Sequence, residues 1–287
     1  MKSNAIKKIR SYFGAMHRMQ EQKVYFEYLE KMRKEYRPFF ETEKVKTYFS
    51  QLRSLLTVKD VGSIGGGFVR IGKHHDGGYV MLDDFNGIDC AYSIGINDDV
   101  SWDADIKKRI GCDIFMYDHT ISALPYTDTH FKWRKIGICG SDTKDKTDML
   151  TLDEMIVKDG MSKNDKMIFK MDVEGAEWEA LDSTESETLG RFDQIVMELH
   201  GLLDFNQMNI IVRVLEKLNL THQLIQIHGS NGSFYIPYGD VNIPNVIEVC
   251  YVRKKGREFC HSERFFPTEL DENNNGILPD VMMGFWN

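Results

Sequence analysis

Two histidines and three carboxylates stand directly after short apolar segments of the sequence. Asp172 and Glu174 follow the segment MIFKM, Glu198 and His200 stand near the end of the segment QIVMELHG, and His228 follows LIQI. Carboxylates close together repel one another unless they bind a cation or accept hydrogen bonds. An imidazole exchanges its proton near neutral pH. These residue types therefore suit general-base chemistry or the binding of a divalent cation.

His200, His228 and Asp172 are the candidate catalytic residues, because side chains at the carboxyl ends of parallel strands meet at one edge of a sheet. Glu198 and His200 are two residues apart, so on a strand they point to the same face. Asp172, Glu198 and His200 would form an oxygen-rich ligand set that suits Mg²⁺ or Mn²⁺. Helix capping and satisfied structural histidines are the alternative interpretation.

A second group of residues suits a nucleoside cofactor. Gly95, in the segment SIGIND, would let the backbone approach a ligand closely, and valine there is expected to block cofactor entry. Asp118 ends the next apolar segment, 23 residues later, where an acidic side chain can accept hydrogen bonds from ribose hydroxyls. Asp142 follows a further strand and is expected to reach the adenine. Structural turns and solvated aspartates are the alternatives.

The elements that must position these residues are short apolar strands alternating with helix-length segments. Strands are predicted at 68–71, 79–82, 90–94, 113–117, 133–138, 167–171, 194–198, 222–227 and 246–252. Helices are predicted at 101–110, 152–159, 175–181 and 205–218. This alternation predicts an α/β fold with a mostly parallel sheet covered by helices on both faces. The last two strands are predicted to form an antiparallel hairpin that closes the sheet.

Residues 1–57 are predicted to form a helical extension, and 58–287 the main domain. Apolar residues recur at helical spacing, Pro38 interrupts the pattern, and a second helix is expected from about Glu41 to Leu56. The recurring residues are Ile6, Ile9, Tyr12, Phe13, Val24, Tyr25, Tyr28, Leu29 and Met32. The extension would pack on the main domain or join two subunits into a homo-oligomer; a basic, aromatic-rich helix can also lie on an anionic membrane. The tail from Phe266 to Asn287 is expected to wrap the domain or cover its site.

The composition excludes several classes of protein. The chain has 287 residues, is 42% apolar and carries a net charge of −8, of which residues 1–60 hold +7 and the rest −15. An acidic body argues against a nucleic-acid binder. We expect no transmembrane segment and no signal peptide, because no apolar run is long enough. Five cysteines without a CxxC pair indicate free thiols in the cytoplasm.

The segment KMDVEGAEWEAL, residues 170–181, resembles the signature of the FkbM-type family of S-adenosylmethionine-dependent methyltransferases. Other segments fit the same group, and the resemblance spans roughly residues 61–255. These are RIGKHHDGGYVM (70–81), YSIGINDD (92–99), YDHTI (117–121), MELHG (197–201) and IPNVIEVCYVRK (243–254). The resemblance implies a Rossmann-like sheet of seven strands. It also implies that Gly95 and its neighbour Asn97 border the methionine part of the cofactor and that Asp118 holds the ribose.

The sequence therefore predicts an S-adenosylmethionine-dependent O-methyltransferase in the cytoplasm. Because family members act on sugars, polysaccharide precursors or polyketides, the expected acceptor is a sugar or nucleotide-sugar hydroxyl in surface-polysaccharide (capsule) biosynthesis. An alcohol is a poor nucleophile, so a base or a divalent metal is expected beside it. Two alternatives stay open. An NAD-dependent oxidoreductase would need a fuller glycine fingerprint than SIGIND, and a noncatalytic binding module would use residues 1–57 for docking.

Overall fold

The computed structural model describes residues 19–287 except 21, 36, 39, 63–66, 144–147 and 164. The predicted helical positions Ile6, Ile9, Tyr12 and Phe13 lie outside the described residues. Among the residues that are described, no helix combines the length and the apolar character needed to cross a bilayer.

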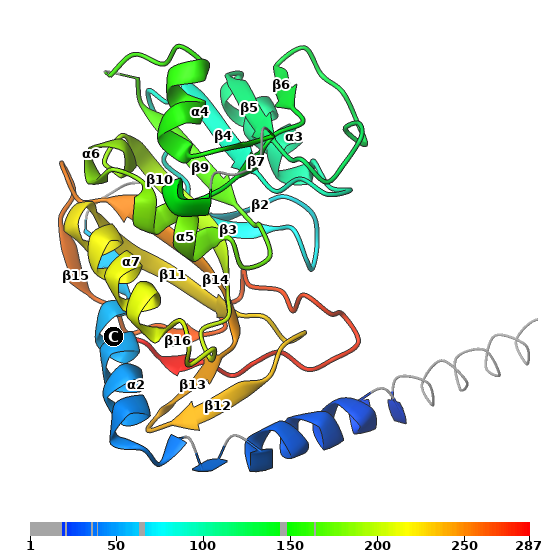
Figure 1. Ribbon diagram of the computed structural model, residues 1–287, viewed down its shortest axis with the longest axis vertical. Helices are drawn as coiled ribbons and strands as arrows, with labels where there is room; N and C mark the ends of the chain where they lie inside the picture. Colours follow the sequence, from blue (N-terminus) through cyan, green and yellow to red (C-terminus); the bar gives the residue numbers. More distant parts are fainter. Residues whose placement is uncertain are drawn as a thin grey trace, which may run out of the picture.

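A seven-stranded, mostly parallel sheet forms the centre of the molecule (Figure 1). Its strands are β4 (Cys90–Ile94), β5 (Asp113–Tyr117), β6 (Phe131–Arg134), β9 (Met167–Met171), β10 (Phe192–His200), β11 (His222–Gly229) and β14 (Val246–Arg253). Their order across the sheet is β11-β14-β10-β9-β4-β5-β6. Only β14 runs antiparallel to its neighbours in this sheet. The predicted Rossmann-like fold class is confirmed.

The chain reverses its direction of travel across the sheet between β4 and β9. It runs outward from β4 through β5 to β6, then returns to build β9 and β10 on the other side of β4. The last residues of the three central strands are in register, since Ile94 pairs with both Tyr117 and Met171. The residue that follows each strand therefore reaches the same edge. Open α/β sheets bind ligands at such a switch point, outside the carboxyl ends of the strands.

Helices cover both faces of the sheet, and each face has its own cluster of buried apolar side chains. On one face pack α2 (Glu43–Leu55), α4 (Leu152–Lys158), α5 (Glu177–Ser183), α6 (Ser186–Leu189) and α7 (Met208–Thr221). On the other face pack α3 (Ser101–Ile110) and the hairpin of β2 (Phe68–Ile71) and β3 (Tyr79–Leu82). In Figure 1, α5 and α7 lie in front of the sheet. Alternating side chains of each strand supply the two clusters, as expected for a doubly covered sheet.

One of the predicted strands is divided in the structure. The segment predicted as one strand over 133–138 is β6 and the separate β7 (Gly137–Ile138), which pairs with β8 (Met149–Leu150). A tight turn separates them, because the Ile136 N–H bonds to the Arg134 carbonyl. β11 and β14 pair antiparallel at one end of the sheet, as predicted, with β14 lying between β10 and β11.

The segment between β11 and β14 contains a further hairpin. It consists of β12 (Tyr235–Tyr238) and β13 (Val241–Pro244). This hairpin extends into a four-stranded sheet with β17 (Gly284–Phe285) and β16 (Phe265–Phe266) from the tail. A short pair of β1 (Lys59–Val61) and β15 (Phe259–His261) lies apart from it.

The helix predicted at 41–56 is confirmed as α2, which buries Tyr48, Phe49 and Leu52 in the main core. Residues 22–35 are helical as well and run along the lower edge of the molecule beside β12 (Figure 1). There the Tyr25 hydroxyl donates to the Ser233 carbonyl at 3.2 Å. The extension therefore packs on the main domain, whereas oligomer formation stays a prediction.

The tail from Phe266 onward is largely irregular and wraps the domain, as predicted. Its Trp286 is fully buried, and the Trp286 carbonyl accepts a hydrogen bond from the Val58 N–H. Glu272 contacts the loop between β2 and β3 by accepting a hydrogen bond from the backbone N–H of His75 at 3.0 Å. The tail thus ties together the extension, the hairpin and the sheet.

Candidate active site

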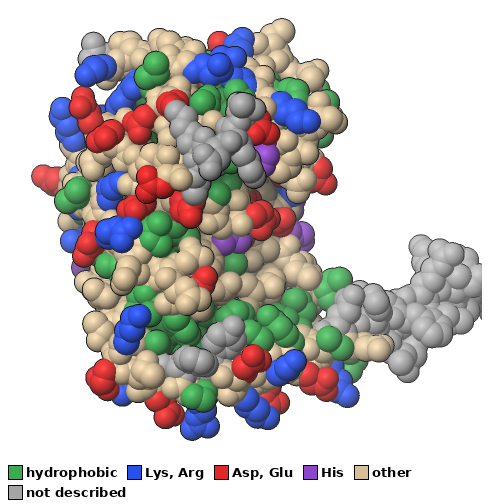
Figure 2. Space-filling view, in the orientation of Figure 1, with side chains coloured by type: hydrophobic (Ala, Val, Ile, Leu, Met, Phe, Trp, Pro, Cys, Tyr) green, Lys and Arg blue, Asp and Glu red, His purple; other side chains and the backbone are tan. Residues whose placement is uncertain are grey.

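A cavity of about 390 Å³ opens at the switch point, over the ends of β4, β5 and β9. Acidic side chains and histidines gather across the middle of this face (Figure 2). Charged lining residues are Asp76, Asp98, Asp99, Asp118, Asp172, Glu174, Glu198, Lys73 and Lys170. Among the described lining residues seven carboxylates thus face two lysines, which makes the cavity attractive to cations.

The turn after β4 is held from both sides. One carboxylate oxygen of Asp118, at the end of β5, accepts hydrogen bonds from the backbone N–H groups of Ile96 at 2.8 Å and Asn97 at 2.9 Å. The ammonium group of Lys170, a buried residue of β9, donates to the Gly95 carbonyl at 2.9 Å. The two neighbouring strands therefore fix the backbone that faces the cavity.

Both carboxylate oxygens of Asp118 already accept hydrogen bonds from the protein itself. Its second oxygen accepts from the N–H of Thr120 at 2.7 Å and from the Thr120 hydroxyl at 2.6 Å. Burial alone would raise the pKa of Asp118, but hydrogen bonds from Thr120, Asn97 and Ile96 bring it below its usual value. Asp118 therefore shapes the turn after β4, and its bond to a ribose stays a prediction.

The backbone conformation and the close contact with Asp172 require glycine at position 95. Valine was expected from the sequence to block cofactor entry, and the structure gives a different reason why it would not be tolerated. The φ of Gly95 is +79°, and a Cβ on it would lie 1.6 Å from the backbone oxygen of Asp172. A valine would therefore collide with the neighbouring strand before it could occupy ligand space.

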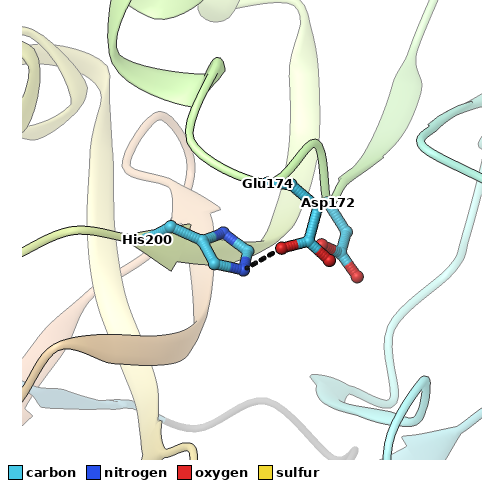
Figure 3. A group of neighbouring side chains, drawn as sticks. All are labelled: Asp172, Glu174 and His200. Atoms are coloured by element: carbon cyan, nitrogen blue, oxygen red, sulfur yellow. Dashed lines mark ion pairs between the residues drawn. The ribbon is translucent and has the colours of Figure 1, made fainter. Parts of the chain in front are cut away.

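Asp172, Glu174 and His200 form the clearest cluster beside the cavity (Figure 3). Asp172 and Glu174 come from the turn after β9, and His200 is the last residue of β10. The His200 Nε2 lies 3.3 Å from a carboxylate oxygen of Glu174. Its Nδ1 lies 2.9 Å from the carboxylate of Glu177, which is fully buried at the start of α5. The prediction that Asp172 and His200 lie close together at one edge of the sheet is confirmed.

The protonation of His200 depends on these neighbours. Burial lowers the pKa of His200, but the hydrogen bond and charge of Glu177, with smaller effects of Asp172 and Glu174, raise it above the usual value overall. A raised pKa means that the imidazole holds its proton more strongly.

Glu198 is not a member of the cluster, which corrects the ligand set predicted from the sequence. The carboxylate of Glu174 stands with Asp172 and His200 instead. Glu198 lines the cavity and is only 8% exposed. Burial, followed by the charge of Asp172 and Glu248, raises the pKa of Glu198 well above its usual value.

His228 does not reach the cavity, contrary to the prediction. Its Nδ1 lies 3.0 Å from Glu248 on β14, and its Nε2 lies 3.0 Å from Asp280 in the tail. Burial lowers the pKa of His228, but hydrogen bonds to Asp280 and Glu248 raise it to about 10. A buried imidazolium between two carboxylates ties the tail to the sheet and has no proton-accepting nitrogen to offer.

We expect His228→Gln to lower the free energy of unfolding by about 3 kcal/mol, because it leaves two carboxylates without their cation. The pKa of His228 rises from an ordinary 6.5 to about 10 on folding, so its stabilisation is complete below about pH 6.5 and is lost as the pH rises toward 10. Urea unfolding of both proteins between about pH 6 and 10 measures this. A difference between them that grows with pH would contradict the assignment.

Asp142 also lies away from the cavity. It belongs to a short 3-10 helix, Ser141–Thr143, and lines a separate surface hollow with Glu179 and Arg213. The prediction that it reaches the adenine is therefore wrong. The cavity wall nearest that segment is instead formed by Ile138 of β7 and Met149 of β8.

Sequence reasoning missed the loop between β2 and β3. Lys73, Asp76 and Gly77 line the cavity, and the Lys73 ammonium lies 3.2 Å from the carboxylate of Asp99. A Cβ on Gly77 would lie 2.3 Å from that same carboxylate. The paired glycines of HHDGGY were the available signal, since such a pair permits close approach of the loop to the turn after β4.

The comparisons with known proteins bear on this site. Residues 125–232 match the family model described as the methyltransferase FkbM domain. No curated protein and no solved structure shows a significant match to the chain. The matched segment includes Asp172, Glu174, Glu198 and His200. This segment is therefore similar to the methyltransferase FkbM domain, in agreement with the family that the motifs of the sequence predict.

Proposed function

We propose that the protein is an S-adenosylmethionine-dependent O-methyltransferase of the cytoplasm. Its acceptor is a sugar or nucleotide-sugar hydroxyl, and its pathway is surface-polysaccharide (capsule) synthesis. The observation that supports this most is the position of the cavity: it lies at the switch point, with the cluster of Asp172, Glu174 and His200 at one side.

The residues present fit this cofactor. S-adenosylmethionine carries a sulfonium and an ammonium group, and the cavity lining is rich in carboxylates. The fixed turn at Gly95 and Asn97 offers backbone close to a ligand, and Ile138 and Met149 offer an apolar wall for a purine. NAD fits less well, because its pyrophosphate would face Asp98 and Asp99 near the same turn.

The order of the strands divides the cavity into two sides. Toward β5 lie the turn after β4, Asp118 and the apolar wall, which suit the nucleoside. Toward β10 lie Asp172, Glu174 and Glu198, which suit an acceptor with several hydroxyl groups. The bound cofactor supplies an electrophilic methyl group. The chain's own residues place the acceptor oxygen in line with it and remove the hydroxyl proton.

The acidity of the cavity limits the acceptor. Sugar hydroxyls can donate hydrogen bonds to carboxylates, whereas a diphosphate would be repelled by them. We therefore place only the sugar ring of a nucleotide sugar inside the cavity and its diphosphate outside, near solvent.

Calorimetric titration with S-adenosylmethionine tests the cofactor. We expect Asp118→Ala to weaken binding by about 2–4 kcal/mol, or roughly 30- to 1000-fold, because the N–H groups of the turn lose their charged acceptor. Asp113→Ala is the matched control: it removes an aspartate from the other end of β5, where its partner is Lys132 at 3.5 Å.

Two results would count against the proposal. One is the absence of binding by the wild type at high micromolar S-adenosylmethionine. The other is equal affinity of the Asp118→Ala and Asp113→Ala proteins. Once binding is established, incubation with nucleotide-activated sugars and mass spectrometry of the products identifies the acceptor.

A further inference from the structure

Three side chains on the acceptor side of the cavity have the spacing of ligands to one metal ion. Nitrogen and carboxylate oxygen atoms of Asp172, Glu174 and His200 lie within 4.8 Å of one another. Metal–ligand bonds of about 2.1–2.4 Å place two ligands of the same ion no more than about 4–5 Å apart. A single ion between them would therefore need only small movements of the side chains.

The imidazole of His200 is oriented as metal-bound histidines are. Its Nδ1 faces the buried carboxylate of Glu177 at 2.9 Å, so its Nε2 is the atom directed toward Glu174. Glu177 is itself fixed by the backbone N–H of Val173 at 3.2 Å. A carboxylate behind a histidine sets its tautomer and strengthens it as a ligand.

One carboxylate of the cluster and one carboxylate beside it have hydrogen-bonding capacity that a bound cation would satisfy. One oxygen of Asp172 is buried and has no hydrogen-bond partner among the described residues. Glu198, 8% exposed and lining the cavity, receives no hydrogen bond from any residue that the structure describes. Buried carboxyl groups are costly to leave unpaired, and neither observation depends on the contacts of His200.

We propose that Asp172, Glu174 and His200 bind a hard divalent cation, Mn²⁺ or Mg²⁺, with Glu198 beside it. Two carboxylates and one imidazole form a ligand set suited to these ions. The ion would bind the acceptor hydroxyl and make its proton easier to remove. This last role rests on the proposed methyl transfer, whereas the binding of the ion does not.

Titration of the metal-free protein with Mn²⁺, followed by the loss of the free-ion electron paramagnetic resonance signal, tests the site without cofactor or acceptor. We expect one bound ion in the wild type, competed by Mg²⁺. Asp172→Asn and His200→Gln should each weaken binding more than tenfold, and Glu177→Gln by about 10- to 100-fold. Asp98→Asn, which removes an exposed carboxylate from the same cavity, should change binding by less than about twofold.

The outcomes are distinct. No Mn²⁺ binding by the wild type below about 1 mM overturns the site, as does equal loss in the Asp98→Asn and Asp172→Asn proteins, which would indicate diffuse attraction. Binding of Zn²⁺ alone would overturn the assignment to a hard cation. If Mn²⁺ binds but S-adenosylmethionine does not, the metal site stands and the methyl-transfer proposal fails. Thermal melting identifies variants that do not fold, and the wild-type titration remains decisive without them.

Discussion

His200→Gln is expected to lower the turnover number by about 10²–10⁴-fold while leaving the affinity for S-adenosylmethionine nearly unchanged. Glutamine cannot replace the imidazole nitrogen that lies 3.3 Å from Glu174. Whether His200 acts as a general base or holds a metal ion, its loss is expected to reduce the turnover number by this factor. Cofactor binding should survive, because the nucleoside side of the cavity is built by β4 and β5. Mass spectrometry of methylated product and calorimetric titration measure the two quantities.

The control for this variant is His130→Gln, which changes a histidine just before β6 that contacts Asp128. It should retain full turnover. If His200 has only a structural role, His200→Gln will lower the melting temperature and leave the rate per folded molecule intact. Treatment of the wild type with EDTA separates the remaining roles: a metal ligand predicts collapse of activity and recovery with Mn²⁺, whereas a metal-free base predicts no response.

Gly95→Ala is expected to destabilise the fold by about 3 kcal/mol and to abolish measurable cofactor binding. An L-residue at a left-handed backbone position costs about 1–2 kcal/mol. The new Cβ also collides with the backbone of Asp172, and forced shifts in a packed region cost about 1–3 kcal/mol. Because the turn after β4 faces the cavity, its displacement should disrupt the site directly. Urea unfolding and calorimetric titration measure both effects.

Gly111→Ala separates the two causes. Gly111 ends α3 with φ of +68°, and a Cβ there would meet no atom of the described chain within 4 Å. It should cost only the backbone penalty of about 1 kcal/mol and leave cofactor binding unchanged. Equal destabilisation by the two alanines would show that the collision with Asp172 is relieved at no cost.

The strands and helices that build the sheet were predictable because short apolar runs end at glycine or charged residues. The bounds of β4, β5, β9 and α3 agree with the sequence prediction for this reason. The break between β6 and β7 was not predictable, because Lys135 and Ile136 at the turn carry no glycine or proline signal. β12 and β13 were hidden as well, since Pro237 and Pro244 are unusual inside strands.

The site was predictable where it depends on strand ends and not where it depends on strand order. Asp172 follows β9 and His200 ends β10, and these two strands are neighbours. His228 lies near the end of β11, but β14 separates β11 from β10, and His228 lies away from the cavity. Lys73 was missed because the packing of the β2–β3 hairpin against α3 decides its position, and no local pattern encodes that packing.

The insertion of β14 also determines the order in which the sheet can be completed. β10 and β11 are both made before β14, and α7 joins them across a gap one strand wide. Until β14 is synthesised, each of them presents an unpaired edge to other chains. A partly made chain is therefore at its most prone to aggregation between the synthesis of β11 and that of β14. The last strand to enter the sheet is thus the one that protects two others.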